Sequence, residues 1–419
     1  MAEQHEKALV PQIRFTGFTD PWEQRKLSDL TDRVSIQSSD SDLPQVEYED
    51  IIPGEGTLNK DLRDKKGGKT GIKFYAGDVL YGKLRPYLMN WLYPQFNGVA
   101  VGDFWVLRAT ECDSSFLYRL VQTGSFQRLA NVSSGSKMPR ADWNLISQSF
   151  FAVPADHAEQ KAIAKGLAEL DTLITLHQRK YDKLCVLKKS MLDKMFPKGG
   201  SLYPEIRFAG FTDPWEQRKL EDYVVVSTAK NVDGRFNKED VLSVSGEYGI
   251  VNQIAFQGRS FAGSSVLNYG IVNTGDIVYT KSPLNSNPYG IIKVNKGIPG
   301  IVSTLYAVYR PQDNVHTNFI QVYFEQHERM NNYMHPLVNK GAKNDMKVTA
   351  ENALKGVVTF PSREEQVIIS EFFDRLDSLI TLHQRKYDGC ANPLFLERRI
   401  SCRKPSHQNR CSATTTPSG

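Results

Sequence analysis

Residues 13–27 read IRFTGFTDPWEQRKL, and residues 206–220 read IRFAGFTDPWEQRKL, so the two segments are identical at 14 of 15 positions. A second pair follows, DTLITLHQRKYD at 171–182 and DSLITLHQRKYD at 377–388, identical at 11 of 12 positions. The period of about 200 residues is far longer than the repeat of a solenoid protein. The sequence therefore predicts a duplicated domain in which particular segments are repeated.

Between the repeated segments the two halves differ almost completely. Only two faint parallels remain: GDVLYGKLRPY from Gly77 against GDIVYTKSPLN from Gly275, and SGSKMPRADW from Ser134 against KGAKNDMKVT from Lys340. A duplicated enzyme would be expected to repeat its catalytic residues, whereas a duplicated reader of two targets would repeat its scaffold and vary its readers. The sequence follows the second pattern.

The repeated frame is predicted to contain two long helices. Bulky positions from 163 to 195 alternate steps of four and three residues, which is the heptad spacing of a helix with one contact seam, and positions 369–387 repeat the register. A helix over 159–196 would be about 57 Å long. Such a seam buries little by itself, so we expect the two helices to pair with each other. The alternative is that each helix caps its own domain.

Several residues of the frame are predicted to be structural. Pro154 and Pro361 precede Glu-Gln pairs at 159–160 and 365–366, which suit a first helical turn. Four seam residues are expected to pack helix against helix rather than to catalyse: His177, Tyr181, His383 and Tyr387. Trp22 and Trp215 are expected to anchor the chain where it enters each domain.

The remaining composition indicates an ordinary soluble protein of two domains with connectors. The inserts combine short β-branched and aromatic runs with helical spacing at 116–129 and 319–333, which indicates mixed α/β structure. The chain carries a net charge of +5, but residues 389–419 hold five basic residues and one acidic residue, which leaves +1 for residues 1–388. The five cysteines form no C-x-x-C pair, so neither a disulfide framework nor a zinc site is expected. The absence of an apolar leader or a membrane-spanning run predicts a cytoplasmic protein.

These features together resemble the specificity subunit of type I restriction–modification systems. The resemblance rests on F-x-G-F-x-D-x-W-E-Q-R-K-L at 15–27 and 208–220, on the G-D-[IV]-[LV]-Y strand, and on the G-[SA]-K segment with its downstream P…E-Q helix. It covers residues 12–388. It implies an α/β (α+β) protein with two target recognition domains of mixed α/β structure, joined by long antiparallel coiled-coil helices.

The resemblance also implies a function and a set of partners. Each divergent insert would read one half of an interrupted, bipartite sequence in double-stranded DNA. The helices would set the spacing and dock the modification (methyltransferase) subunits, two in number, while restriction (motor–nuclease) subunits join through the complex. The chain itself would be non-catalytic and would need no cofactor or metal. The expected divisions are 1–155 and 201–361 for the recognition domains, 156–200 for the central helix, 362–388 for a shortened second helix, and 389–419 for an atypical tail.

The candidate DNA-binding residues are polar residues in two loops of each insert, because Arg and Lys pair with phosphates and guanine edges and Asn with adenine. They are Lys83, Arg85, Lys137 and Arg140 in the first insert, and Lys281, Asn285, Asn287, Lys340, Lys343 and Asn344 in the second. Solvated loop cations are the alternative for each. Tyr87 and Tyr289 are expected to pack rather than to stack on bases.

Two rival functions remain open. A fused DNA methyltransferase or nuclease is disfavoured because Asn287-Pro288-Tyr289 lacks the second proline of the adenine methyltransferase box and no glycine-rich cofactor loop precedes it. A bivalent protein-binding adaptor differs from the DNA reader only in its partner, and a salt-dependent DNA-binding assay separates the two.

The tail departs from the repeat. After Asp388 the first copy's continuation KLCVLKKSMLDKMF has no counterpart, and Gly389 and Pro393 are expected to end the helix. Residues 397–419 are expected to be disordered. The second helix would then be about half as long as the first, which bears on docking and on spacing.

Overall fold

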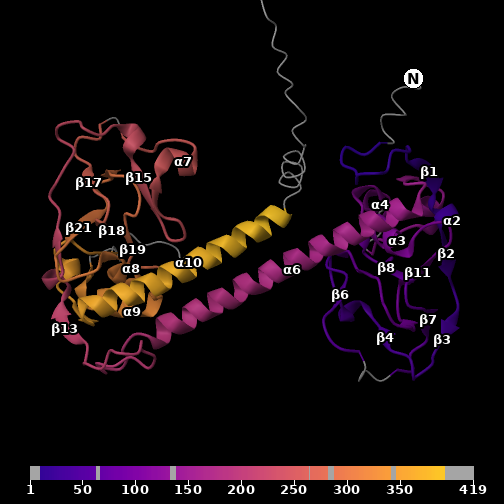
Figure 1. Cartoon of the computed structure of the whole chain (residues 1–419), viewed down its shortest axis with the longest axis horizontal. Helices are drawn as coiled ribbons and strands as arrows, with labels where there is room; N and C mark the ends of the chain where they lie inside the picture. The colour runs from indigo at the N-terminus through magenta and orange to yellow at the C-terminus, as the bar shows by residue number, and fades with distance from the viewer. Residues whose placement is uncertain are drawn as a thin grey trace, which may run out of the picture. The chain divides into compact units, whose positions relative to one another are not determined.

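The computed structural model describes residues 10–62, 67–132, 138–263, 265–281, 287–340 and 346–391. The chain divides into two compact units, unit 1 up to Thr175 and unit 2 from Leu176 to Asp388. Helix α6 (His157–Lys194) contributes to both, and helix α10 (Arg363–Ala391) follows the last strand of unit 2 (Figure 1). No described helix has the length and apolar composition needed to cross a membrane.

Unit 1 is built on two four-stranded sheets. The first has the order β2-β11-β8-β9 and the second β3-β7-β10-β4, while β1 pairs antiparallel with β12 beside them. The strands are β1 (Glu23–Lys26), β2 (Thr31–Val34), β3 (Gln37–Ser38), β4 (Gln45–Val46), β5 (Ile51–Ile52), β6 (Thr57–Leu58), β7 (Gly71–Phe74), β8 (Val79–Gly82), β9 (Trp91–Leu92), β10 (Gly98–Ala100), β11 (Phe104–Ala109) and β12 (Phe150–Val153). The short helices are α2 (Leu27–Leu30), α3 (Ser114–Leu120), α4 (Gly124–Ala130) and α5 (Trp143–Ser147).

Unit 2 repeats the first sheet of unit 1 strand for strand. Its main sheet has the order β14-β21-β18-β19, and β13 pairs with β24 as β1 pairs with β12. The strands are β13 (Glu216–Lys219), β14 (Val224–Val226), β15 (Leu242–Ser245), β16 (Gly249–Asn252), β17 (Gly270–Val272), β18 (Ile277–Tyr279), β19 (Ile292–Val294), β20 (Gly300–Val302), β21 (Ala307–Pro311), β22 (Asn339–Lys340), β23 (Met346–Lys347) and β24 (Val357–Phe360). The helices are α7 (Gln253–Gln257), α8 (Thr317–Glu325) and α9 (His327–Met334).

The faint G-D-x-x-Y parallel marks the matching central strands. Val79 lies opposite Leu107 in β11, and Ile277 lies opposite Tyr309 in β21, so the two strands have the same antiparallel register. All described residues of β8 and β18 are buried, because alternate side chains of each strand pack into hydrophobic clusters on the two faces of its sheet. A fully buried strand needs only apolar side chains of suitable size, and the two units therefore share a sheet without sharing its sequence.

The helical spacing of each insert corresponds to two short helices, α3 with α4 and α8 with α9, rather than one. In unit 1 the break lies at Thr123, whose side chain accepts a hydrogen bond from the backbone N–H of Phe126 and so caps α4.

The Glu-Gln pair at each helix start is a buried clamp and not only a favourable first turn. Glu159 is almost fully buried and receives both Nε and a terminal nitrogen of Arg14 at 2.7 Å. Glu365 holds Arg207 in the same way, at 2.8 and 2.7 Å. The repeated segment at 13–27 is thereby tied to the start of the long helix.

The neighbouring glutamine joins a third element to the same point. Gln160 donates to the carbonyl of Pro154 at 2.8 Å and accepts from the backbone N–H of Asp113 at 2.7 Å, at the start of α3. Gln366 makes the equivalent bonds to Pro361 and His316 in unit 2. The tryptophans beside the clamps differ: Trp215 is buried in the core, whereas Trp22 is partly exposed.

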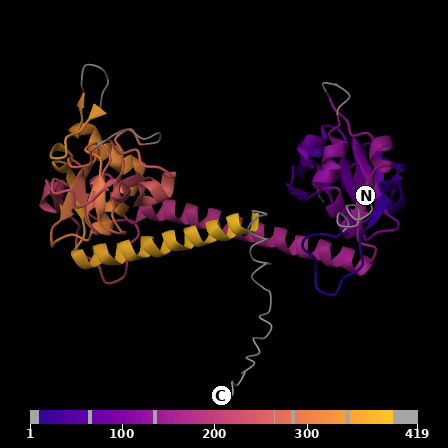
Figure 2. The same ribbon diagram turned by 90° about the horizontal axis from the view of Figure 1, so that it is seen from above.

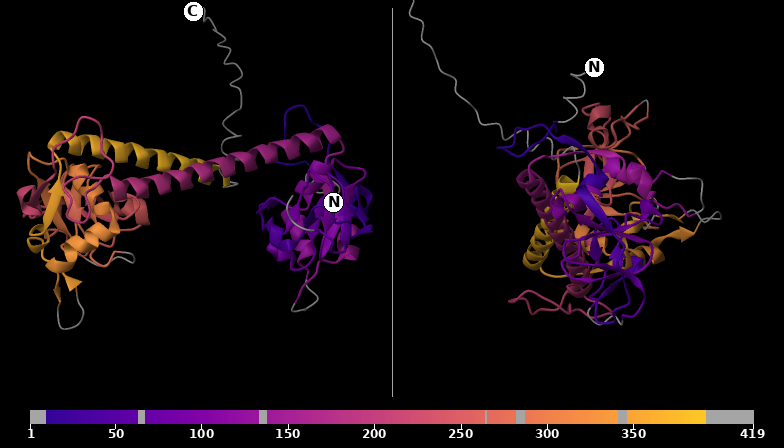
Figure 3. Two further views of the ribbon diagram at one scale, coloured as in Figure 1. Left: turned by 90° about the horizontal axis from the view of Figure 1, so that it is seen from below. Right: turned by 90° about the vertical axis from the view of Figure 1, so that its right-hand side faces the viewer.

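Within unit 2 the second half of α6 pairs antiparallel with α10. His177 meets His383, Lys188 meets Asp377, and Phe196, just past the end of α6, packs on Phe373. The two helices run side by side (Figure 2), and both lie on the same side of this unit (Figure 3). The expected pairing of the two seams is therefore present here.

Helix α10 continues to Ala391, so the expectation that Gly389 ends it at Asp388 is wrong. A single glycine costs a helix only about 1 kcal/mol relative to alanine, which a helix of 29 residues tolerates. Pro393 and the residues expected to be disordered lie outside the described part of the chain.

The two copies of the long helix differ in how well they are covered. Phe373 is fully buried beneath Phe196, whereas its repeat counterpart Leu167 is exposed. By the same repeat, the counterpart of Phe196 is Cys402 in the divergent tail. The first half of α6 thus displays an apolar side chain that its copy buries.

Candidate nucleic-acid interface

In unit 1 the structure brings two candidate loops together. The post-strand loop (residues 83–89) follows β8, and the late loop (residues 138–141) precedes α5. Leu84 and Arg140 form an antiparallel bridge, the backbone N–H of Arg85 donates to Pro139 at 2.8 Å, and that of Ala141 donates to Lys83 at 2.8 Å. Lys83, Arg85 and Arg140, which are up to 57 residues apart in the sequence, therefore occupy one surface.

A tyrosine from another segment fixes this arrangement. The Tyr48 hydroxyl donates to the carbonyl of Asp103 at 2.6 Å and accepts from the backbone N–H of Leu84 at 3.2 Å. Burial raises the pKa of Tyr48 well above its ordinary value, so the hydroxyl stays protonated and keeps both bonds. Its ring stacks on Phe104 with centroids 4.5 Å apart.

Asp103 connects the two candidate cations. The ammonium of Lys83 lies 3.5 Å from one carboxylate oxygen, and the guanidinium of Arg140 lies 2.9 Å from the other. Neither Asp103 nor Tyr48 was among the sequence candidates. Only the register of β8 against β11 places Asp103 beside Lys83, and the sequence gives no sign of that register.

Arg85 is held in a strained backbone conformation. Arg85, Met89 and Lys281 are the non-glycine residues with positive φ in the described part of the chain, at 49°, 56° and 53°, and all three lie in post-strand loops. Such strain persists where surrounding contacts enforce it and is frequent at binding sites. The Arg85 Nε is buried and has no hydrogen-bond partner among the described residues.

The same surface of unit 1 carries exposed apolar side chains. Tyr87, Leu88 and Met89 of the post-strand loop and Met138 of the late loop are all exposed. The expectation that Tyr87 packs internally is therefore wrong, because the loop turns its ring outward. A basic surface interleaved with apolar side chains suits contacts to phosphates and to base methyl groups.

In unit 2 the equivalent loop begins at Lys281. Its ammonium donates to the carbonyl of Thr304 at 3.2 Å, and burial lowers its pKa. Asn287 accepts a backbone hydrogen bond from Gly290 at 3.0 Å within a turn. Tyr289 packs against the core of unit 2, as expected, and its carbonyl accepts from the Tyr279 hydroxyl at 2.7 Å.

The remaining candidates of the sequence stay predictions. Lys137, Asn285, Lys343 and Asn344 lie outside the described residues. Lys340 belongs to β22, of which only the backbone is described.

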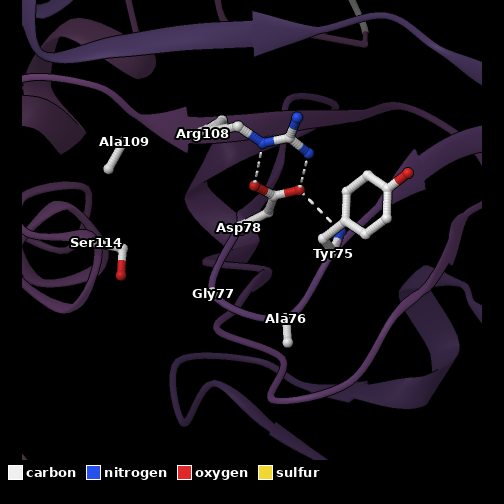
Figure 4. A pocket seen from close by; sticks show the side chains of 7 residues that line it. All are labelled: Tyr75, Ala76, Gly77, Asp78, Arg108, Ala109 and Ser114. Atoms are coloured by element: carbon white, nitrogen blue, oxygen red, sulfur yellow. Dashed lines mark hydrogen bonds and ion pairs between the residues drawn. The ribbon is translucent and has the colours of Figure 1, made fainter.

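The described surface also has a shallow, open pocket of about 340 Å³ near the start of α3. Arg108 and Asp78 form a bidentate pair across it, at 2.9 and 2.7 Å, and Arg108 lies over the ring of Tyr75 (Figure 4). The hydrogen bonds to Asp78 raise the pKa of Arg108, and the two side chains satisfy each other's hydrogen-bonding groups. The Arg108–Asp78 pair therefore has a structural role, and the pocket is not a candidate ligand site. Among the described residues, no three His, Cys, Asp or Glu side chains are grouped to hold a metal ion.

Comparison with known proteins bears on the same question. The specificity subunit of the type I restriction enzyme EcoDI from Escherichia coli is 26% identical over 203 residues. The crystal structure of the type I restriction–modification system S subunit from M. genitalium aligns over 93% of this chain and 97% of that one, with a TM-score of 0.55 and 11% identity. The chain is similar to type I specificity subunits.

The two comparisons differ in what they support. The aligned sequence spans 46% of this chain and 46% of the Escherichia coli protein, so the chain matches about half the length of that relative. The structural likeness is one of fold, which in this chain comprises two mixed α/β units and two long helices that pair antiparallel. Together they confirm the resemblance and the fold class expected from the sequence. No protein-family model matches the chain.

Proposed function

We propose that this chain is the non-catalytic DNA-specificity subunit of a type I restriction–modification complex, and that its two units read the two halves of an interrupted target in double-stranded DNA. The observation that carries the proposal is the contrast between frame and loops. The Arg–Glu and Gln clamps and the main sheet are the same in both units, whereas the post-strand loops present different side chains.

Partners follow from the proposed function. Two modification subunits would dock on the helical frame, restriction subunits would join through the complex, and the helices would set the distance between half-sites. A reader with two unlike domains requires a target with two unlike halves. Cations held on one surface, as Lys83 and Arg140 are, supply phosphate contacts that fix orientation, and base-edge contacts supply the sequence preference.

The experiment that tests the proposal is co-expression with the cognate modification subunit in cells lacking other DNA methylation, followed by mapping of methylated adenines. A single interrupted motif with two unlike halves is expected. The same test is run with a chain in which residues 389–402 are replaced by the first-copy segment 183–196. Methylation by neither chain would turn the interpretation toward a protein-binding adaptor.

A matched variant assigns the halves. Lys83→Ala with Arg140→Ala should relax or abolish recognition of one half of the motif and leave the other half unchanged. Lys165→Ala, an exposed helix cation, is the control and should leave both halves as they are. Loss of both halves together in the loop variant, with its folding intact, would contradict the assignment of one half to each unit.

A further inference from the structure

The Asp103 carboxylate of unit 1 forms ion pairs with both cations of the candidate interface. One oxygen faces Lys83 at 3.5 Å, and the other receives the Arg140 Nε at 3.3 Å and a terminal nitrogen at 2.9 Å. The two cations come from different loops that the backbone brings together, and this carboxylate pairs with both of them.

The position of Asp103 itself is rigid. It lies between β10 and β11, directly after Gly102, whose φ of +105° allows the tight turn. Its carbonyl accepts from the Tyr48 hydroxyl and from the backbone N–H of Lys83 at 2.9 Å. These bonds hold the backbone that carries the carboxylate beside the start of the post-strand loop.

The ion pairs are weak enough to be exchanged. The side chains of Lys83, Asp103 and Arg140 are 32%, 29% and 55% exposed. Solvent screens pairs of this exposure, and they contribute little to stability. A phosphate or a guanine edge offers the same cations an equivalent partner.

Unit 2 lacks this carboxylate. Trp105 lies opposite Tyr81, and Ala307 lies opposite Tyr279, so the residue equivalent to Asp103 is Leu305. Lys281, the counterpart of Lys83, donates instead to the neutral carbonyl of Thr304. The two units therefore differ in the charge they present at the same point of the same sheet.

We propose that Asp103 is a positioning residue for DNA recognition by unit 1. Its carboxylate pairs with Lys83 and Arg140 and weakens their attraction to the phosphates of any DNA. A duplex of matching sequence replaces the carboxylate as the partner of both cations. This inference rests on the proposed function, since it presumes that unit 1 binds DNA. It adds that unit 1 contains a built-in competitor for non-target DNA, whereas unit 2 has Leu305 at the equivalent position.

The test measures binding of the full-length chain to a fluorescent duplex of random sequence from about 50 to about 200 mM KCl. Asp103→Asn should bind about threefold to tenfold more tightly than the parent chain, with a steeper dependence of log K on log salt, because two cations become free for phosphates. Asp171→Asn is the control, because it removes the same negative charge at another ion pair of unit 1. Asp171 of the long helix α6 pairs with Arg119 of α3 at 2.7 Å. It should change binding much less.

A second variant shows whether the gain in DNA affinity depends on the two cations. Adding Lys83→Met and Arg140→Met to Asp103→Asn should remove the gain, and circular dichroism melting verifies that each variant is folded. The proposal is overturned if Asp103→Asn binds no more tightly than Asp171→Asn, or if the gain persists in the triple variant. If the parent chain and all variants fail to bind the duplex even at the lowest salt, the proposed function itself fails.

Discussion

Replacing Lys188 by methionine should destabilise the attachment of the long helix to unit 2 by about 3 kcal/mol. The ammonium lies 2.7 Å from Glu325 of α8 and 2.6 Å from Asp377 of α10, so one side chain of α6 joins three helices. Burial by itself would lower the pKa of Lys188, but the two carboxylates outweigh it and hold the pKa above its ordinary value. The lysine is therefore charged near neutral pH.

The magnitude follows from the burial of the cluster. The side chains of Lys188, Glu325 and Asp377 are 16%, 21% and 41% exposed. Removing one partner of a buried ion pair costs about 3–5 kcal/mol, because the remaining charge stays in a poorly solvated place. Burial raises the pKa of Asp377 in spite of the attraction of Lys188. The partial exposure of Asp377 and the buried Lys293 beside Glu325 both reduce the loss, which places it at the lower end of that range.

The assay is hydrogen exchange of peptides covering 184–194 and 317–325, because a chain of two units need not unfold in one step. A loss of about 3 kcal/mol corresponds to about a hundredfold lower protection. Lys189→Met, at an exposed neighbouring position, is the control and should change protection by less than about threefold. Adding Asp377→Asn to Lys188→Met restores neutrality and should recover more than half of the loss. A fall in protection of less than about fivefold for Lys188→Met would refute the reasoning.

Three further predictions concern the helix pair and the sheet. Burial lowers the pKa of both His177 and His383, whose Nδ1 atoms lie 3.0 Å apart, and the nearby lysines of both helices lower it further. The stability of the pair should therefore be complete above about pH 6.5 and decrease as the pH falls through the lowered values, and urea midpoints should lose this dependence when both histidines are replaced by glutamine. Replacing residues 389–402 by the first-copy segment 183–196 should protect the first half of α6 from hydrogen exchange, since the graft restores the missing cover; unchanged exchange would contradict the repeat argument. Gly82→Ala should lower the melting temperature of unit 1 by about 5 °C, because a Cβ at this end of β8 would lie 2.7 Å from the Tyr48 ring and 2.9 Å from the Asn90 carbonyl; an unchanged melting curve would contradict this packing argument.

Much of the helical frame could be predicted from the sequence because its signals are local. Heptad spacing and the Pro…Glu-Gln starts depend on residues a few positions apart, and the structure has long helices at these places. The end of α10 was placed too early because a glycine was weighed by its local preference alone. The rest of this long helix offsets the small cost of one glycine, so the helix continues through Gly389.

The candidate interface was predictable only in part. The faint G-D-x-x-Y and late-loop parallels located Lys83, Arg85 and Arg140, whose residue types suit DNA. That these residues share a surface, and that Asp103 and Tyr48 organise it, depends on strand register between segments far apart in the chain. Register follows from which faces are buried together, and a single sequence does not display that information.

The sequence by itself determined the duplication, the positions of the two helices and the resemblance to specificity subunits, since near-identical segments and periodic seams are visible without a fold. Only the tertiary structure decided that the two divergent inserts share one sheet. It also decided that Arg14 and Arg207 form ion pairs with buried glutamates, and that a single carboxylate pairs with two cations of unit 1. The physical reason is that burial and charge pairing are set by side chains brought together across the fold, whereas periodicity is set by neighbours along the chain.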